Sequence, residues 1–104
     1  MVDLDQVLTG LVRRTEEGIL KWSRTVEGSR FTTSVDTISI LISIDSEGYR
    51  LDILDESGEV VESLQYADTT VEQDKKLERL FVLARRSAHN IDSTLEKLAR
   101  GLEL

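Results

Sequence analysis

The chain of 104 residues has no cysteine, no proline and a single histidine. Without cysteine it can form neither a disulfide nor a thiolate metal site, and one histidine cannot supply a pair of imidazole ligands. The longest apolar segment, residues 38–44, is interrupted by serines and is far shorter than the roughly 20 residues that span a bilayer. The first residues lack the basic and apolar stretches of a secretory signal. These absences indicate a cytoplasmic protein without a membrane segment.

Glycine-rich loops and recognisable catalytic sets are also missing. The six glycines lie eight or more residues apart, so neither a G-x-G-x-x-G turn nor a Walker loop occurs. A nucleophile set could be assembled from Ser87, His89 and Asp92. We do not expect one, because a single turn between two helices offers no oxyanion hole and no nucleophile elbow. Carboxylates are plentiful, but most fall in expected turns, where they are solvated, and not across a dry cleft. We therefore expect a protein that is not an enzyme and uses no cofactor and no metal.

Charge is segregated along the chain. Residues 31–74 hold eleven carboxylates and one base, Arg50, whereas residues 1–30 hold five of each and residues 75–104 hold seven bases and four acids. The net charge is -7. Such a field bears on partners and solubility. It also opposes the approach of DNA, and adjacent bases such as Arg85 and Arg86 diverge by about 100° on a helix. Nucleic-acid binding is therefore not expected.

Apolar residues near the start recur at helical spacing. The pattern predicts a helix over about residues 3–16, with Asp3 and Gln6 placed to form a capping box at its first turn. Gly18 follows the last turn, where glycine commonly takes the left-handed conformation that ends a helix. After Gly18 the spacing of the apolar residues becomes that of a β-strand.

The middle of the chain has the alternation of β-strands. Residues 38–44 alternate isoleucine with serine or leucine. The sequence D-x-x-G occurs at residues 45–48 and again at 55–58, and an aspartate followed by glycine at this spacing is typical of hairpin turns. An antiparallel meander with strands over about 38–45, 49–55 and 59–65 is expected. An earlier pair over about 19–26 and 30–35 adds two strands.

Helical spacing returns after residue 70. A helix is predicted over about residues 71–88, with a capping box either at Thr70 and Gln73 or at Thr69 and Glu72. Its apolar stripe comprises Leu77, Leu80, Phe81, Ala84 and Ala88. Asn90 can then cap a last helix. The apolar positions of that helix are Ile91, Leu95, Leu98 and Leu102.

The order α-β-β-β-β-β-α-α favours a single α+β domain over residues 1–104. Grouped strands indicate an antiparallel meander of about five strands, with the N-terminal helix and both C-terminal helices packed on one face. The other face is then open to water.

Several short patterns follow one another along this chain. They are T-x-x-G-x-L-x-W at Thr15, Gly18, Leu20 and Trp22, the D-x-x-G hairpins, and L-x-x-L-x-x-x-A-R-R from Leu77 to Arg86. This succession resembles short bacterial α+β proteins of unassigned function. The resemblance implies a stand-alone prokaryotic domain, and it implies no activity and no site residues.

The charge layout suggests a non-enzymatic protein-interaction module. We expect an acidic sheet face, carried by Asp52, Asp55, Glu59 and Glu62, that binds a protein partner with a basic surface, or else a homodimer. The alternative is a small-ligand-binding or sensor subunit. Its pocket would lie between sheet and helices, near Trp22, Phe31, Tyr49 and Phe81.

Overall fold

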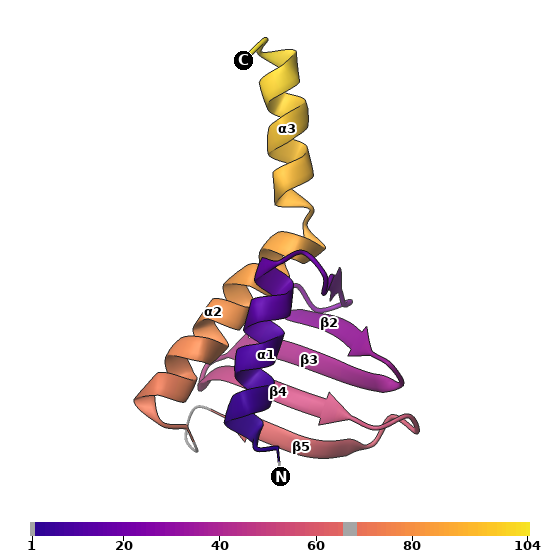
Figure 1. Cartoon of the computed structure of the whole chain (residues 1–104), viewed down its shortest axis with the longest axis vertical. Helices are drawn as coiled ribbons and strands as arrows, with labels where there is room; N and C mark the ends of the chain where they lie inside the picture. The colour runs from indigo at the N-terminus through magenta and orange to yellow at the C-terminus, as the bar shows by residue number, and fades with distance from the viewer. Residues whose placement is uncertain (1, 66–68) are drawn as a thin grey trace.

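The computed structural model describes residues 2–65 and 69–104, except for the side chains of residues 91 and 92. Its elements follow the predicted order (Figure 1). They are α1 Leu4–Glu16, β1 Ser23–Arg24, β2 Arg30–Val35, β3 Ile38–Asp45, β4 Gly48–Leu54, β5 Val60–Gln65, α2 Val71–Ala88 and α3 Ile91–Gly101. The strands form one antiparallel sheet in chain order. The predicted α+β fold is confirmed.

Both long helices begin with the capping box that the sequence predicts. At α1, the Gln6 N–H donates to Asp3 Oδ1 at 2.8 Å, and the Asp3 N–H donates to Gln6 Oε1 at 3.0 Å. At α2, Thr70 and Gln73 exchange the same two bonds at 3.1 Å each. Each box satisfies two N–H groups that the first turn of a helix leaves without an internal acceptor. The helix starts are therefore fixed by local chemistry.

The D-x-x-G hairpins also form as predicted. Gly48 and Gly58 have φ of 115° and 88°, a region that glycine enters without the steric cost a Cβ would add. In the second turn, Asp55 Oδ1 accepts the N–H of Ser57 at 2.9 Å and that of Glu59 at 3.1 Å. These bonds hold β4 and β5 in register next to the turn.

The first strand is much shorter than predicted. Residues 19–26 were expected to be extended, but β1 contains only Ser23 and Arg24. The N–H groups of Ile19 and Leu20 instead donate to the carbonyl of Arg14 at 3.0 and 3.1 Å, which closes the end of α1. Their backbone is thus used in a helix cap and is not available for sheet pairing.

The core lies between α1, α2 and one face of the sheet (Figure 1). Strand alternation places every second side chain on this face. The register pairs Ile42 with Leu51 and Leu51 with Leu64, so these residues form one layer beneath the helices. The buried apolar residues are Leu8, Leu11, Trp22, Phe31, Ile40, Ile42, Leu51, Leu64, Leu77, Leu80 and Ala84.

The last helix departs from the expected packing. Figure 1 shows α3 extending away from the sheet and from α1, and it does not cover the sheet face as the sequence suggested. The cause is Asn90, whose φ of 57° and ψ of 39° put a single left-handed residue between α2 and α3. Asparagine enters this region more readily than most residues. The break redirects the chain and gives the molecule extents of 50 × 30 × 28 Å.

Candidate functional site

α3 carries an apolar stripe that its own domain leaves uncovered. Leu95, Leu98 and Leu102 are 50%, 55% and 60% exposed. At about 100° per residue they lie within an arc of about 60° on one side of the helix. The position of Ile91 continues the stripe, although its side chain lies outside the described part of the structure. A continuous apolar stripe on an exposed helix is typical of a contact surface for another protein element.

Charges flank this stripe asymmetrically. Glu96 lies on one side of the stripe, about 100° from Leu95, and Glu103 follows the end of the helix; both are exposed. Lys97 lies on the other side. The backbone of Glu103 is left-handed, with φ of 59°, where the N–H of Leu104 donates to the carbonyl of Ala99 at 2.9 Å. The tip of α3 therefore combines a leucine with an adjacent carboxylate.

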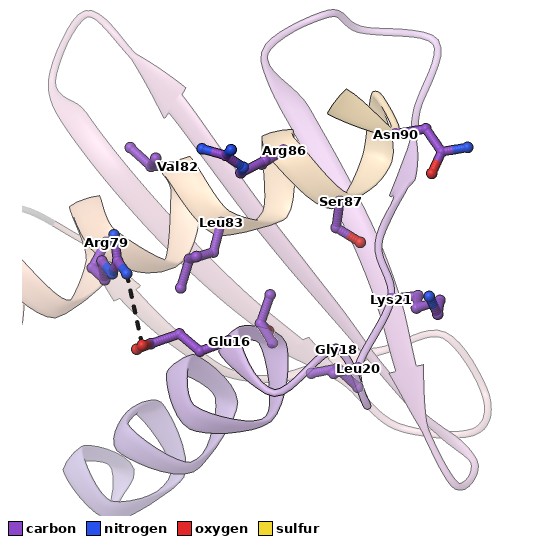
Figure 2. A pocket seen from close by; sticks show the side chains of 11 residues that line it. Glu16, Gly18, Leu20, Lys21, Arg79, Val82, Leu83, Arg86, Ser87 and Asn90 are labelled. Atoms are coloured by element: carbon purple, nitrogen blue, oxygen red, sulfur yellow. Dashed lines mark ion pairs between the residues drawn. The ribbon is translucent and has the colours of Figure 1, made fainter. Parts of the chain in front are cut away.

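A cavity of about 470 Å³ lies between the end of α1 and the second half of α2, beside the root of α3. Figure 2 shows Leu83 and Ser87 directed from α2 towards α1, with Asn90 at the end of the row. The lining residues are Thr15, Glu16, Gly18, Leu20, Lys21, Arg79, Val82, Leu83, Arg86, Ser87 and Asn90. Their side chains give the cavity apolar walls and a polar rim.

Cations outnumber carboxylates around this cavity. Lys21, Arg79 and Arg86 contribute positive charge, and Glu16 is the lining carboxylate. Arg79 pairs with Glu16 at 3.7 Å between exposed side chains, which bridges α1 and α2. Such an exposed pair contributes little to stability. Three cations and one carboxylate give the lining a net formal charge of +2, which favours an anionic group.

A second cavity of about 340 Å³ adjoins the first along α1, because Glu16 lines both. Val12, Arg13 and Lys76 are among its other lining residues. Lys76 Nζ pairs with Asp5 at 3.0 Å, a further bridge between the two helices. We refer to these two cavities together as the helix groove.

Trp22 holds the wall of the first cavity in place. Its indole N–H donates to Thr15 Oγ1 at 3.0 Å, and its backbone N–H donates to Ser87 Oγ at 2.9 Å. The Thr15 hydroxyl donates in turn to the carbonyl of Leu11 at 2.7 Å. These bonds link α1, α2 and the segment between α1 and β1. The T-x-x-G-x-L-x-W pattern therefore builds a structural connection.

The aromatic residues predicted to surround a ligand fill space between the sheet and α2. Phe81 stacks against Phe31 with ring centroids 5.5 Å apart and against Tyr49 at 5.4 Å. Trp22 is buried in the same core cluster as Phe31 and is held by the hydrogen bonds described above. None of these four residues lines the helix groove. Burial, and then the negative charges of Glu78 and Asp74, raise the pKa of the Tyr49 phenol.

The predicted acidic residues do not gather on one face. Asp52 lies on the uncovered side of the sheet, opposite Leu41 and Ser63, and is only 7% exposed. Its carboxylate accepts from Arg50 Nε at 3.0 and 3.1 Å and from the Ser63 hydroxyl at 2.5 Å. Glu62 is exposed on the opposite side, because it pairs with Ile53, which shares a strand face with the buried Leu51. The expectation of a single acidic face is corrected, because strand alternation separates these two side chains.

Asp55 and Glu59 lie in the turn between β4 and β5. This turn and that between β2 and β3, which contains Asp36, lie at the same end of the sheet, whereas the turn with Asp45 lies at the other end (Figure 1). Hydrogen bonds from the Ser57 hydroxyl and then from backbone N–H groups lower the pKa of Asp55. The acidic charge is thus concentrated at the strand ends and not across the sheet.

The residues considered for chemistry are engaged in structural contacts. Ser87 Oγ accepts a hydrogen bond from Trp22, and the His89 ring lies edge-on to Phe31 with centroids 5.8 Å apart. The side chain of Asp92 lies outside the described residues. Across residues 2–65 and 69–104, no group of three or more acidic or histidine side chains is arranged to hold a metal ion. In the same residues, no helix has the length and apolar character required to cross a bilayer.

Comparison with protein-family models, with curated proteins and with solved structures finds no match to this chain. The candidate site is therefore argued from the geometry of the chain itself. It consists of the α3 stripe and the helix groove.

The basic rim of the groove was missed when the sequence was considered alone. Adjacent bases such as Arg85 and Arg86 diverge on a helix, so these pairs do not predict a shared basic face. Arg79, Val82 and Arg86 stand at i, i+3 and i+7, which places them on one side of α2. That spacing was the available signal for a basic stripe facing away from the core.

Proposed function

We propose that this protein is a non-enzymatic protein-interaction module and that α3 is its main contact element. The supporting observation is the exposed stripe of Leu95, Leu98 and Leu102 on a helix of 11 residues. Isolated helices shorter than about 12–15 residues are marginal in water, and most helical stability comes from packing an apolar face. α3 lacks such packing along most of its length (Figure 1). A partner that covers the stripe supplies it.

Covering this stripe contributes to binding but is not sufficient for it alone. Full burial of a leucine side chain is worth roughly 1.5–3 kcal/mol, and these three leucines are about half exposed. Covering them therefore yields roughly 2–4.5 kcal/mol before the cost of association. That amount reaches at most the lower end of the roughly 4–15 kcal/mol that association costs, so a stable complex requires further contacts.

Acidic residues at one end of the sheet favour a basic partner for those further contacts. Asp55, Glu59 and Glu62 lie in or beside the turn between β4 and β5. Charges of this kind steer association and raise its rate more than they raise affinity. Neutralising these residues should therefore slow association with a basic partner and reduce its dependence on salt.

The test compares two glutamate substitutions in α3. Leu98→Glu places a charge within the stripe, whereas Arg100→Glu places the same side chain on the opposite side of the helix. Capture experiments with the whole chain should lose specific partners with Leu98→Glu and retain them with Arg100→Glu. Partners that bind Leu98→Glu with unchanged affinity would refute α3 as the contact element.

A small anionic ligand is the second candidate, supported by the cationic rim of the 470 Å³ cavity. Its volume falls in the range of sites for small molecules. A panel of carboxylate and phosphate metabolites in a thermal-shift assay tests it, because a ligand that binds the folded chain raises the melting temperature. The shift should disappear when Lys21 and Arg86 are replaced by glutamate.

A further inference from the structure

The helix groove and the α3 stripe are complementary surfaces on the same chain. We propose that the partner of α3 is a second copy of this chain, and that the tip of each α3 binds in the cavity beside the root of the other. This inference rests on the proposed function and names the partner, whose basic surface is the cationic rim of its own cavity. The resulting assembly is a two-fold symmetric dimer in which the two α3 helices run antiparallel.

The position of Asn90 argues against occupation of the cavity by the α3 of the same chain. Asn90 both precedes the first turn of α3 and lines the cavity, so that α3 starts at the cavity edge and leads away from it. To enter this cavity, the tip of α3 would have to turn back towards the start of its own helix. A second copy meets no such restriction, because a two-fold axis through the middle of α3 brings the tip of one helix to the root of the other.

The two surfaces also match in chemistry. The tip of α3 presents Leu102 and Glu103, both exposed. The cavity presents apolar side chains from Leu20, Val82 and Leu83, with Lys21 and Arg86 among its cations. In the dimer, Leu102 packs against the apolar walls while the Glu103 carboxylate approaches the basic rim. Near the axis, Leu95 and Leu98 meet their counterparts in the second copy.

Interface area favours this reciprocal arrangement over a simple pairing of two α3 helices. At 1.5 Å per residue, a helix of 11 residues is about 16 Å long. Contact over that length alone falls short of the roughly 800 Å² per partner that specific interfaces usually bury. Binding each tip in the groove of the other copy adds two helix-in-groove contacts. Two-fold symmetry thus extends the interface onto α1 and α2 of both copies.

The experiment is sedimentation of the purified whole chain over a wide concentration range, with substitutions that separate the parts of the interface. The wild-type chain should show a monomer–dimer equilibrium. Leu98→Glu should weaken it about thirty-fold or more, as expected for a central apolar contact, and Arg100→Glu should change it little. Trp22 fluorescence reports whether each variant has kept its folded core, because Trp22 is buried and its hydrogen bonds link α1, α2 and the segment between α1 and β1.

Charge reversal then tests the cavity itself. Glu103→Lys and the pair Lys21→Glu with Arg86→Glu should each weaken the dimer, and their combination should restore most of the affinity. A wild-type chain that stays monomeric overturns this inference, while the capture experiment above decides the proposed function independently. A dimer that is lost with Leu98→Glu but shows no charge-reversal rescue overturns the cavity as the binding site. A dimer that survives Leu98→Glu overturns the role of α3 in it.

Discussion

Replacing Gly10 by alanine should stabilise the folded chain. Gly10 is exposed in the middle of α1, and a Cβ built there meets no atom within 4 Å. Glycine in a helix interior costs roughly 0.8–1 kcal/mol relative to alanine, because the unfolded glycine has more backbone freedom to lose. Since no contact opposes the added methyl group, nearly the whole difference should appear in the free energy of unfolding.

The expected rise in melting temperature follows from the length of the chain. With an unfolding entropy of about 2.1 cal/mol/K per residue, a chain of 104 residues gains about 4–5 °C from 1 kcal/mol. Thermal unfolding followed by far-UV circular dichroism and by the fluorescence of Trp22 measures this shift. The two probes should give the same melting transition if the chain unfolds in a two-state reaction.

Gly18→Ala is the matched control. Gly18 is equally open, but its φ of 75° puts an alanine in the left-handed region, at a cost of about 1–2 kcal/mol. This variant should lower the melting temperature by about 5 °C or more. The reasoning would be refuted by a Gly10→Ala protein that melts below the wild type, or by the same shift in both variants.

Three further predictions concern single hydrogen bonds and ionisations. Ser87→Ala leaves the backbone N–H of Trp22 without its acceptor and should lower the free energy of unfolding by about 1–3 kcal/mol in urea titrations, whereas Ser57→Ala in the exposed turn should cost much less. Ser57→Ala should also raise the pKa of Asp55 towards its ordinary value in an NMR titration, and an unchanged pKa would contradict the assigned cause. The raised pKa of Tyr49 means that the unfolded chain releases this phenolic proton first, so stability present below about pH 10 is lost as pH rises further. Tyr49→Phe should remove the part of the stability loss at alkaline pH that comes from this phenol. The same dependence of stability on alkaline pH in both proteins would exclude this contribution.

Local chemistry explains why most of the fold could be predicted from the sequence. The capping boxes at Asp3 and Thr70 begin their helices with bonds between residues three apart, and Gly58 supports a turn that depends on its own φ. The alternation of isoleucine in β3 fixes which face of the strand is buried. Each of these features is decided within a few residues of the chain.

The features that could not be predicted depend on distant or competing contacts. The apolar spacing of Leu95 and Leu98 predicts a helix, but the same stripe suits packing on its own sheet or on another molecule. Residues 19 and 20 have a strand-like sequence, yet their N–H groups are taken by the carbonyl of Arg14. Asp52 and Glu62 are close in sequence, and only the pairing of Asp52 with Ser63 and of Glu62 with Ile53 reveals that they face opposite ways.

The longest dimension of the molecule depends on the single left-handed residue between α2 and α3. Two torsion angles at Asn90 set the heading of the final helix, while the packing of α1 and α2 on the sheet is independent of them. Substitutions of Asn90 can therefore reorient α3 without weakening the packing of α1 and α2 on the sheet. Small-angle scattering would register such a change in the longest dimension of the particle, even where the melting curve is unaltered.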